Sequence, residues 1–494
     1  MTKSKTNDRI AAYVGISSPE TPKYLLANNF LLEYFQPSNQ LFQSYDYDWF
    51  ESRKILHTQD EENKVKLKAS FNRFLYRYLG DETIHDENRR LDKSSHFFFP
   101  LTQNMLVEGN TTLRHMLYHL QTLDDDFNYE EIQEYLADYI FRDSMGINAI
   151  WKVLFQEDVN NIRWRRREDP SENDFWTMLK PAEKTRLKRL GQRLNEDLYT
   201  LLTHEYFKRL DFYRRYQYLS MLLTSYVIQY IVTRKGPNEY MLCKGSSLDG
   251  KLNGSVHRAC CYNYARLREI FPEWLQKYYE EAFQEIVGEE QSILLVAHDG
   301  NVWIGESTLE DFTKKLSGRR GNLGISYDKL LKGFRLEDGG KRSMPVKEFV
   351  WSYISLTGSK QGSSLKKISS VLSTSGKQID MVYPKSNVNQ KYFAMSESLT
   401  EFYVRLYLAT QRRQYDYLDN FMEFLQERYH IVIAKTSASE KLIKQVRPIL
   451  STQDFGKNKQ AFLETLNGNN CLIKLSDSGF IVTLPEEKGG FKLI

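Results

Sequence analysis

The chain has 494 residues, of which 41% are hydrophobic, 14% are aromatic and 27% are charged, and its formal net charge is +4. This apolar content is enough for real hydrophobic cores, which excludes a globally disordered chain, and the length corresponds to roughly three domains. The glycine count of 26 is low for a doubly wound nucleotide-binding enzyme, so the composition argues against that class.

The cysteines and the apolar segments indicate a cytoplasmic protein without a membrane partner. Cys243, Cys260, Cys261 and Cys471 match neither a disulfide framework nor a Cys-x-x-Cys metal knuckle. The first ten residues carry charges but no apolar signal segment. The most apolar stretch, 222–232, is much shorter than the ~20 residues of a membrane helix. We therefore expect it to be a buried helix segment.

Four successive ranges are expected, in a mainly α fold with a multi-helix N-terminal body and a small α/β middle. Residues 1–235 are predicted to form an aromatic-rich helical domain, because apolar side chains recur at helical spacing. The longest expected helix runs from about His204 to Arg234 and ends at Gly236-Pro237. Residues 236–311 are predicted to form a small α/β segment, in which Asp299-Gly300 joins two strands of a hairpin. The expected elements there are a strand at 239–243, a helix at 260–287, and strands at 292–297 and 302–304.

Residues 312–385 are the most basic range and the first candidate for nucleic-acid binding. This range has 15 Lys or Arg residues against 5 Asp or Glu residues, and aromatic residues such as Trp351 lie among them. Basic side chains on Gly-rich or Ser-rich turns can reach phosphates, although an acidic protein partner is an alternative. The stretch Ser359–Lys377 is Ser-rich and is expected to be a mobile linker or loop. The candidate nucleic-acid-binding residues are Arg319, Arg320, Lys332, Arg335, Lys341, Arg342, Lys360, Lys366 and Lys367.

Residues 386–494 are predicted to form a winged-helix-like domain, because helices are followed by a terminal β-hairpin. Lys457 and Lys459 near the start of its fourth helix complete the candidate nucleic-acid-binding set. The domain could contact DNA or dock on a protein. The expected helices cover 399–409, 415–429, 440–450 and 458–466, the expected short strand covers 431–433, and the hairpin covers 471–475 and 480–484.

A metal-dependent nuclease is the main catalytic alternative. Asp249 and Lys251 form the Asp-x-Lys half of such a site, and Asp299 could supply a second carboxylate. Asp249 and Asp299 both lie in turns, where Asp is common for structural reasons. The same loop matches Gly-x4-Gly-Lys, but Leu252 stands where a phosphate loop needs Ser or Thr. No cofactor or metal is therefore expected.

The C-terminal quarter resembles a family. The segments that carry the resemblance are Lys391–Ser396, Leu399–Leu408, the Phe421, Phe424, Leu425, Arg428, Tyr429, Ile431 pattern, and Leu475–Gly479. They resemble the tail of bacterial anti-phage accessory proteins, with DptG of phosphorothioation-dependent DNA restriction as the nearest family. The resemblance implies a helical protein that works beside ATPases of the FtsK/HerA class, and it implies no catalytic residue.

The sequence thus favours a non-catalytic DNA-associated scaffold or sensor subunit, and the resemblance implies that it belongs to a bacterial anti-phage restriction complex. The expected partners are double-stranded DNA and an ATPase or nuclease subunit that acts in trans. The alternatives are the nuclease and a pure protein-interaction module.

Overall fold

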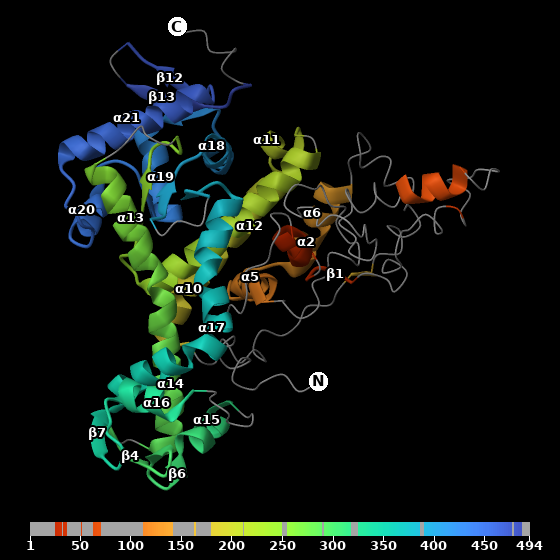
Figure 1. The fold of residues 1–494 in the computed structure, drawn as a ribbon. Coiled ribbons are helices and arrows are strands. Elements are labelled where there is room, and N and C mark those ends of the chain that lie inside the picture. Colours follow the sequence, from red (N-terminus) through yellow and green to blue (C-terminus); the bar gives the residue numbers. More distant parts are fainter. Residues whose placement is uncertain are drawn as a thin grey trace. The chain divides into compact units, whose positions relative to one another are not determined.

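The computed structural model describes residues 25–31, 33–36, 51, 63–70, 112–141, 163–164, 179–210, 212–248, 254–288, 291–317, 325–385, 390–476 and 479–486. These ranges are mainly helical and contain four small sheets, which confirms the expected mainly α class (Figure 1). None of the helices in these ranges combines the length and the apolarity needed to span a bilayer.

The chain divides into two compact units, and each unit combines segments that are distant in sequence. Unit 1 comprises residues 1–19, 171–180 and 266–373, and unit 2 comprises residues 20–170, 181–265 and 374–494. These units differ from the four successive ranges 1–235, 236–311, 312–385 and 386–494, because strands from distant parts of the chain pair with one another.

Unit 1 contains an antiparallel sheet in the order β6-β5-β4-β7, together with helices that share an aromatic core. Alternate β4 side chains, from Ile293 to Ala297, are buried. The predicted hairpin is confirmed, and Asp299 and Gly300 at its turn have φ values of 53° and 70°. The rings of the core are Tyr279, Phe283, Phe312, Phe334, Phe349 and Tyr353. The elements are α14 (Ile270–Val287), β4 (Ser292–His298), β5 (Asn301–Ile304), β6 (Ser307–Thr308), α15 (Leu309–Ser317), α16 (Tyr327–Phe334), β7 (Lys341–Pro345) and α17 (Val346–Gln378).

The expected linker at Ser359–Lys377 is wrong, because the backbone of α17 is helical throughout this stretch. Serine and glycine have weak helix propensity, and packing is observed at both ends of α17. In unit 1 the first turns of α17 bury Phe349 and Tyr353. In unit 2 its last turn packs tightly on β8, and a Cβ at Gly376 would lie 2.2 Å from a methyl carbon of Val382.

The N-terminal part of unit 2 is a helical body around α12. The apolar stretch 222–232 is buried in α12, as expected. The expected helix from His204 to Arg234 is instead two helices. The His204 side chain accepts the backbone N–H of Tyr206 and caps the short α11. The elements of this part are α2 (Leu25–Leu31), β1 (Phe35–Gln36), α5 (Thr112–Thr122), α6 (Tyr129–Phe141), β2 (Arg163–Trp164), α10 (Pro181–Thr203), α11 (Glu205–Lys208) and α12 (Phe212–Lys235).

A four-stranded sheet joins this body to the C-terminal segments of unit 2. Its order is β11-β3-β9-β8, and the central strand β3 runs parallel to both β11 and β9. The side chain of Asn458 fastens the sheet to α21: its amide donates to the carbonyls of Cys243 and Ile433, and its oxygen accepts the N–H of Gly245. The elements are β3 (Met241–Lys244), α13 (Ser255–Arg268), β8 (Val382–Tyr383), β9 (Tyr392–Ala394), β11 (Ile431–Val432) and α21 (Thr452–Gly468).

The C-terminal segments follow the expected order of helices and then a β-hairpin, but two expected helices differ. The helix expected at 440–450 is the shorter α20, which ends at Ile443. The range expected to start a helix at Tyr415 begins with a strand, β10, which pairs with β13. The short strand expected at 431–433 is present as β11, and it pairs with β3. The remaining elements are α18 (Glu397–Gln411), β10 (Tyr415–Tyr417), α19 (Leu418–Tyr429), α20 (Ser437–Ile443), β12 (Leu472–Lys474) and β13 (Phe480–Thr483).

A buried polar network links α10, α12 and α19 in unit 2. The carboxylate of Asp197, which is 0% exposed, accepts the hydroxyl of Tyr226 at 2.6 Å, the hydroxyl of Tyr429, and Nε of Arg428 at 2.8 Å. Burial, and then the charge of Asp197, raises the pKa of both tyrosines, so their hydroxyls stay protonated and donate. The network therefore holds three helices together, because its donors and the Asp197 carboxylate that accepts from them are hydrogen-bonded to one another.

Candidate nucleic-acid interface

The C-terminus of α16 presents Arg335 to solvent. Arg335 caps the helix in the left-handed conformation, with φ 49° and ψ 49°, and its backbone N–H donates to the carbonyls of Leu331 and Lys332. Leu330, Phe334 and Leu336 are buried around it and fix this turn, while the Arg335 side chain is exposed. The turn also lies close to α17, because a Cβ at Gly333 would come within 2.4 Å of Leu356 Cδ2.

Arg342 on β7 ties the end of α16 to the start of α17. Its guanidinium donates to the carbonyl of Phe334 at 2.7 Å and to Oε1 of Glu348 at 2.8 Å. Arg342 pairs with the buried Leu295 of β4, so it lies on the helix-covered face of the sheet. This guanidinium is committed to the protein, and its main effect is to position its neighbours.

The first turns of α17 supply Lys347 and Trp351, which are four residues apart and so share one face of the helix. Lys347 is exposed, and the Trp351 side chain is 42% exposed. Within the described ranges neither Arg335 nor Lys347 forms an ion pair or a side-chain hydrogen bond. Both cations are therefore available to an external anion.

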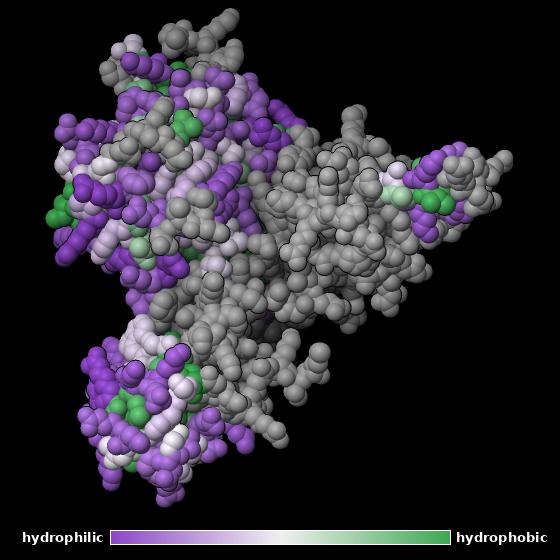
Figure 2. All heavy atoms as spheres, viewed as in Figure 1, coloured by the Kyte–Doolittle hydropathy of each residue, from purple (hydrophilic) through white to green (hydrophobic). Residues whose placement is uncertain are grey.

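These side chains surround a cavity of about 500 Å³, called here the α16–α17 cavity. Three of its lining residues are cations and one is a carboxylate, so its walls carry an excess of positive charge. The first turn of α17 adds the positive end of a helix dipole. The visible surface of unit 1 is mostly hydrophilic, with a few hydrophobic side chains (Figure 2). The lining residues are Gly333, Arg335, Arg342, Pro345, Lys347, Glu348, Trp351 and Ser352.

The structure brings two of the predicted residues, Arg335 and Arg342, into the cavity wall. Lys332 is exposed on α16, three residues before Arg335, but it does not line the cavity. Lys341 is also exposed, but it pairs with Val296 and so faces away from the helix-covered side of the sheet.

The other predicted basic residues lie elsewhere. Arg319 and Arg320 fall outside the described residues. Lys360, Lys366 and Lys367 belong to α17, of which the structure describes only the backbone at these positions. Lys457 and Lys459 belong to α21 of unit 2, where Lys459 Nζ pairs with Asp419 at 2.9 Å.

The described residues do not bring the three candidate nuclease residues together. Asp249 and Lys251 lie outside them. The Asp299 side chain, 88% exposed at the hairpin turn, pairs with Nδ1 of His298 at 3.0 Å. No group of three or more His, Cys, Asp or Glu residues that could hold a metal ion occurs in the described part of the chain. The first glycine of the Gly-x4-Gly-Lys pattern, Gly245, is occupied with α21, since its N–H donates to Asn458.

A second cluster of reactive side chains lies beside the end of β3. Lys244, which is 2% exposed, places Nζ 4.5 Å from the centre of the Tyr392 ring, and Cys261 Sγ lies 3.7 Å from His257 Nε2. Burial raises the pKa of the Cys261 thiol, although Lys244 partly opposes this shift. A protonated thiol is a weak nucleophile, so this cluster is better suited to packing than to covalent chemistry.

Sequence reasoning missed Lys347 as a site residue and gave Trp351 no specific role. The signal that could have found them is the Pro-Val-Lys-Glu start of α17, which is typical of a helix N-terminus and places Lys347 four residues before an aromatic side chain. No protein-family profile, curated protein or solved structure matches this chain. The chemistry of the site therefore rests on its own residues.

Proposed function

We propose that the protein binds double-stranded DNA through the α16–α17 cavity, as a DNA-associated subunit that does not itself catalyse a reaction on DNA. The observation that carries this proposal is the convergence of Arg335 and Lys347 on one cavity beside the half-exposed Trp351. Cationic side chains of a DNA-binding protein contact the phosphates of the DNA backbone, and these contacts supply most of its sequence-independent affinity.

Each lining residue has a defined part in this proposal. Arg335 and Lys347 contact phosphates, because each is exposed and holds no anion within the described ranges. Arg342 positions Arg335 through the carbonyl of Phe334 and positions the start of α17 through Glu348. The Trp351 ring offers a flat apolar surface on which a sugar of the DNA backbone can rest.

A wider role follows from the resemblance of the C-terminal quarter and rests on it alone. In this role the protein is the scaffold or sensor subunit of an anti-phage restriction complex, and a partner ATPase or nuclease supplies the catalysis. The winged-helix interpretation of residues 386–494 stays a prediction: the order α21, β12, β13 supports it, while the pairing of β11 with β3 extends the fold beyond it.

The direct test is duplex binding by an Arg335→Ala/Lys347→Ala double variant. Fluorescence anisotropy with a labelled duplex of about 20 base pairs measures the affinity at several salt concentrations. The double variant should bind about tenfold more weakly at low salt, and the slope of log affinity against log salt should fall by about 2, because two phosphate contacts are lost.

The matched control is a Lys314→Ala/Lys329→Ala double variant. It removes the same charge from two exposed lysines of unit 1 that do not line the cavity, so its affinity should stay near that of the parent. Equal losses in both variants would show a general charge effect and reject the cavity as the site. Absence of duplex binding by the parent at low salt would reject the DNA function and leave an acidic protein as the ligand class for the cavity.

A further inference from the structure

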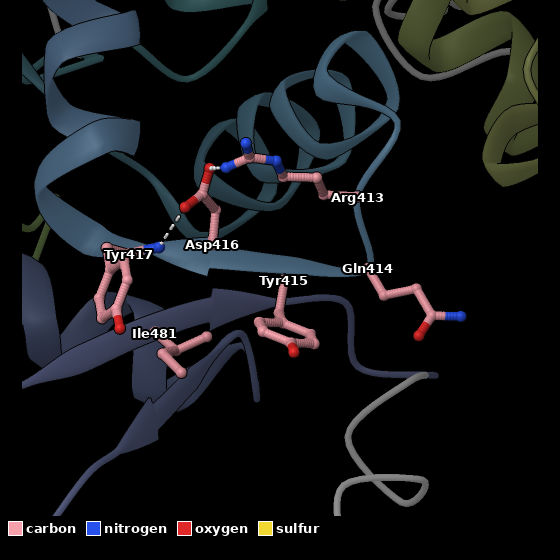
Figure 3. A pocket seen from close by; sticks show the side chains of 6 residues that line it. All are labelled: Arg413, Gln414, Tyr415, Asp416, Tyr417 and Ile481. Carbon is pink, nitrogen blue, oxygen red and sulfur yellow. Dashed lines mark hydrogen bonds and ion pairs between the residues drawn. The ribbon is translucent and has the colours of Figure 1, made fainter.

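Strand β10 of unit 2 exposes two tyrosines on one face. The Tyr415 and Tyr417 side chains are 48% and 60% exposed, while Asp416 between them is buried. This is the alternation of a β-strand, in which side chains two residues apart share a face. Both rings lie on the side of β10 away from the Asp416 carboxylate, with Ile481 of β13 beside them (Figure 3).

The buried side of β10 holds this face in a fixed position. The Asp416 carboxylate accepts the Tyr407 hydroxyl at 2.7 Å, Nη1 of Arg413 at 2.6 Å, Nδ2 of Asn420 at 2.9 Å and the N–H of Tyr417 at 2.7 Å. Burial opposes the charge, but these four donors outweigh it and lower the pKa of Asp416. The strand that carries the tyrosines is thus fixed before any ligand binds, which reduces the entropy lost on binding.

A hollow of about 390 Å³ lies along this face. Ile481 pairs with Tyr417 across the sheet and forms its apolar floor. Two exposed arginines precede β10: Arg412, which does not itself line the hollow, and Arg413, which lines it and whose guanidinium binds Asp416. The Tyr206 hydroxyl donates to the carbonyl of Arg413 and adds a third aromatic residue beside these cations.

We propose that this face binds single-stranded nucleic acid, with two successive bases stacked on Tyr415 and Tyr417 and a backbone phosphate at Arg412. Two residues of a strand advance by about 6.6 Å. This is about twice the ~3.4 Å rise between successive bases along one strand of a duplex. Only bases that have separated from each other can therefore meet the two rings, which selects an unpaired and extended strand.

The chemistry at the two ends of the face fits the same ligand. Every base has a flat π-face, and aromatic side chains beside basic ones are the usual surface for single strands. Arg413 is bound to Asp416, so Arg412 is the cation with the greater freedom to meet a phosphate. This inference concerns unit 2 and a different nucleic-acid form, so it does not rest on the α16–α17 cavity.

The test compares a Tyr415→Ala/Tyr417→Ala double variant with the matched Tyr415→Phe/Tyr417→Phe control. Full-length proteins are titrated into a labelled ten-nucleotide oligothymidylate, an abasic oligomer of equal length and a duplex. The alanine variant should bind oligothymidylate at least about tenfold more weakly, because stacking contributes strongly for each base. The phenylalanine variant keeps both rings and should stay within about twofold of the parent. Duplex affinity should be unchanged in both variants.

An Arg412→Ala variant provides a second measurement that does not depend on the tyrosines. Its salt slope for oligothymidylate should fall by about 0.7, the value for one phosphate contact with a single strand. Equal binding of oligothymidylate by the alanine variant and the parent would overturn the proposal, as would equal binding of the abasic oligomer by the parent. The Arg335→Ala/Lys347→Ala variant separates the two sites, since it should lose duplex affinity and keep its preference for bases over abasic sites.

Discussion

Arg342 in unit 1 and Arg428 in unit 2 both bind a carboxylate through the guanidinium, but their contacts differ in sequence separation and in burial. Arg342 connects groups six and eight residues away, and its side chain is 26% exposed. Arg428 connects to Asp197, 231 residues away, and its side chain is 15% exposed. Short-range and half-exposed contacts leave neighbouring cations in water, where they can meet a ligand. Long-range and buried contacts stabilise the fold instead. Breaking the contacts of Arg428 should therefore lower the free energy of unfolding, whereas breaking those of Arg342 should mainly change ligand affinity.

The largest expected effect is on the buried network. Asp197→Asn leaves Arg428 without its buried partner charge, and breaking a buried pair in this way costs about 3–5 kcal/mol. The free energy of unfolding, measured by urea denaturation at neutral pH, should fall by this amount.

The matched control is Glu196→Gln. Glu196 also binds the Arg428 guanidinium, at 2.7 Å, but its side chain is 63% exposed. Exposed pairs contribute up to about 1 kcal/mol. Equal losses for the two substitutions would show that burial does not distinguish the two carboxylates, and the comparison would fail.

The next effect is the response of unit 2 to acid. Burial, and then the charge of Arg193, lowers the pKa of His430 to about 4, and its ring lies 3.0 Å from the carbonyl of Glu239. The native state therefore keeps His430 neutral, while the unfolded state takes up a proton below about pH 6.5. This contribution to stability is present above pH 6.5 and is lost as the pH falls from 6.5 to 4.

A His430→Asn variant should lack this acid-sensitive contribution. Asparagine tolerates the left-handed conformation of His430, which has φ 54°. Between pH 7 and pH 4 the parent should lose about 3 kcal/mol more of its unfolding free energy than the variant, measured from urea midpoints at both pH values. Parallel losses in the two proteins would show that His430 does not titrate between these limits.

The smallest effect concerns the exposed side of the comparison. Glu348→Gln removes the carboxylate of the α16–α17 cavity, and its side chain is 44% exposed. Stability should change by less than about 1 kcal/mol. Duplex affinity at low salt should instead rise about two- to threefold, because the cavity gains positive charge. A Glu310→Gln control on α15 should leave affinity unchanged, and weaker binding by Glu348→Gln would show that its bond to Arg342 matters more than its charge.

The parts of the fold that local sequence determines were predicted well. Asp299-Gly300 identified the hairpin, because few other residue pairs accept positive φ at both positions. The burial of 222–232 followed from its apolar run. The Ser-rich stretch of α17 was mistaken for a linker, because the contacts that hold it, such as that between Gly376 and Val382, are tertiary.

The candidate site was predicted only in part for the same reason. Charge density identified Arg335 and Arg342, but nothing local shows that Arg342 is occupied by Phe334 and Glu348. Lys347 and Trp351 enter the site because α17 begins beside the end of α16. The pairing of β3 with β11 and β9 could not be read from one sequence, since no local pattern sets the partner of a distant strand.

The position of β3 in the middle of its sheet has a consequence for folding during synthesis on the ribosome. Met241 pairs with Ile431, so the sheet cannot close until about 190 more residues have been made. At 5–20 residues per second this interval lasts about 10–40 s. All four residues of β3 are buried in the folded protein. During this interval of synthesis they lack the strands that pair with β3. We expect the nascent chain to depend on a chaperone during that interval.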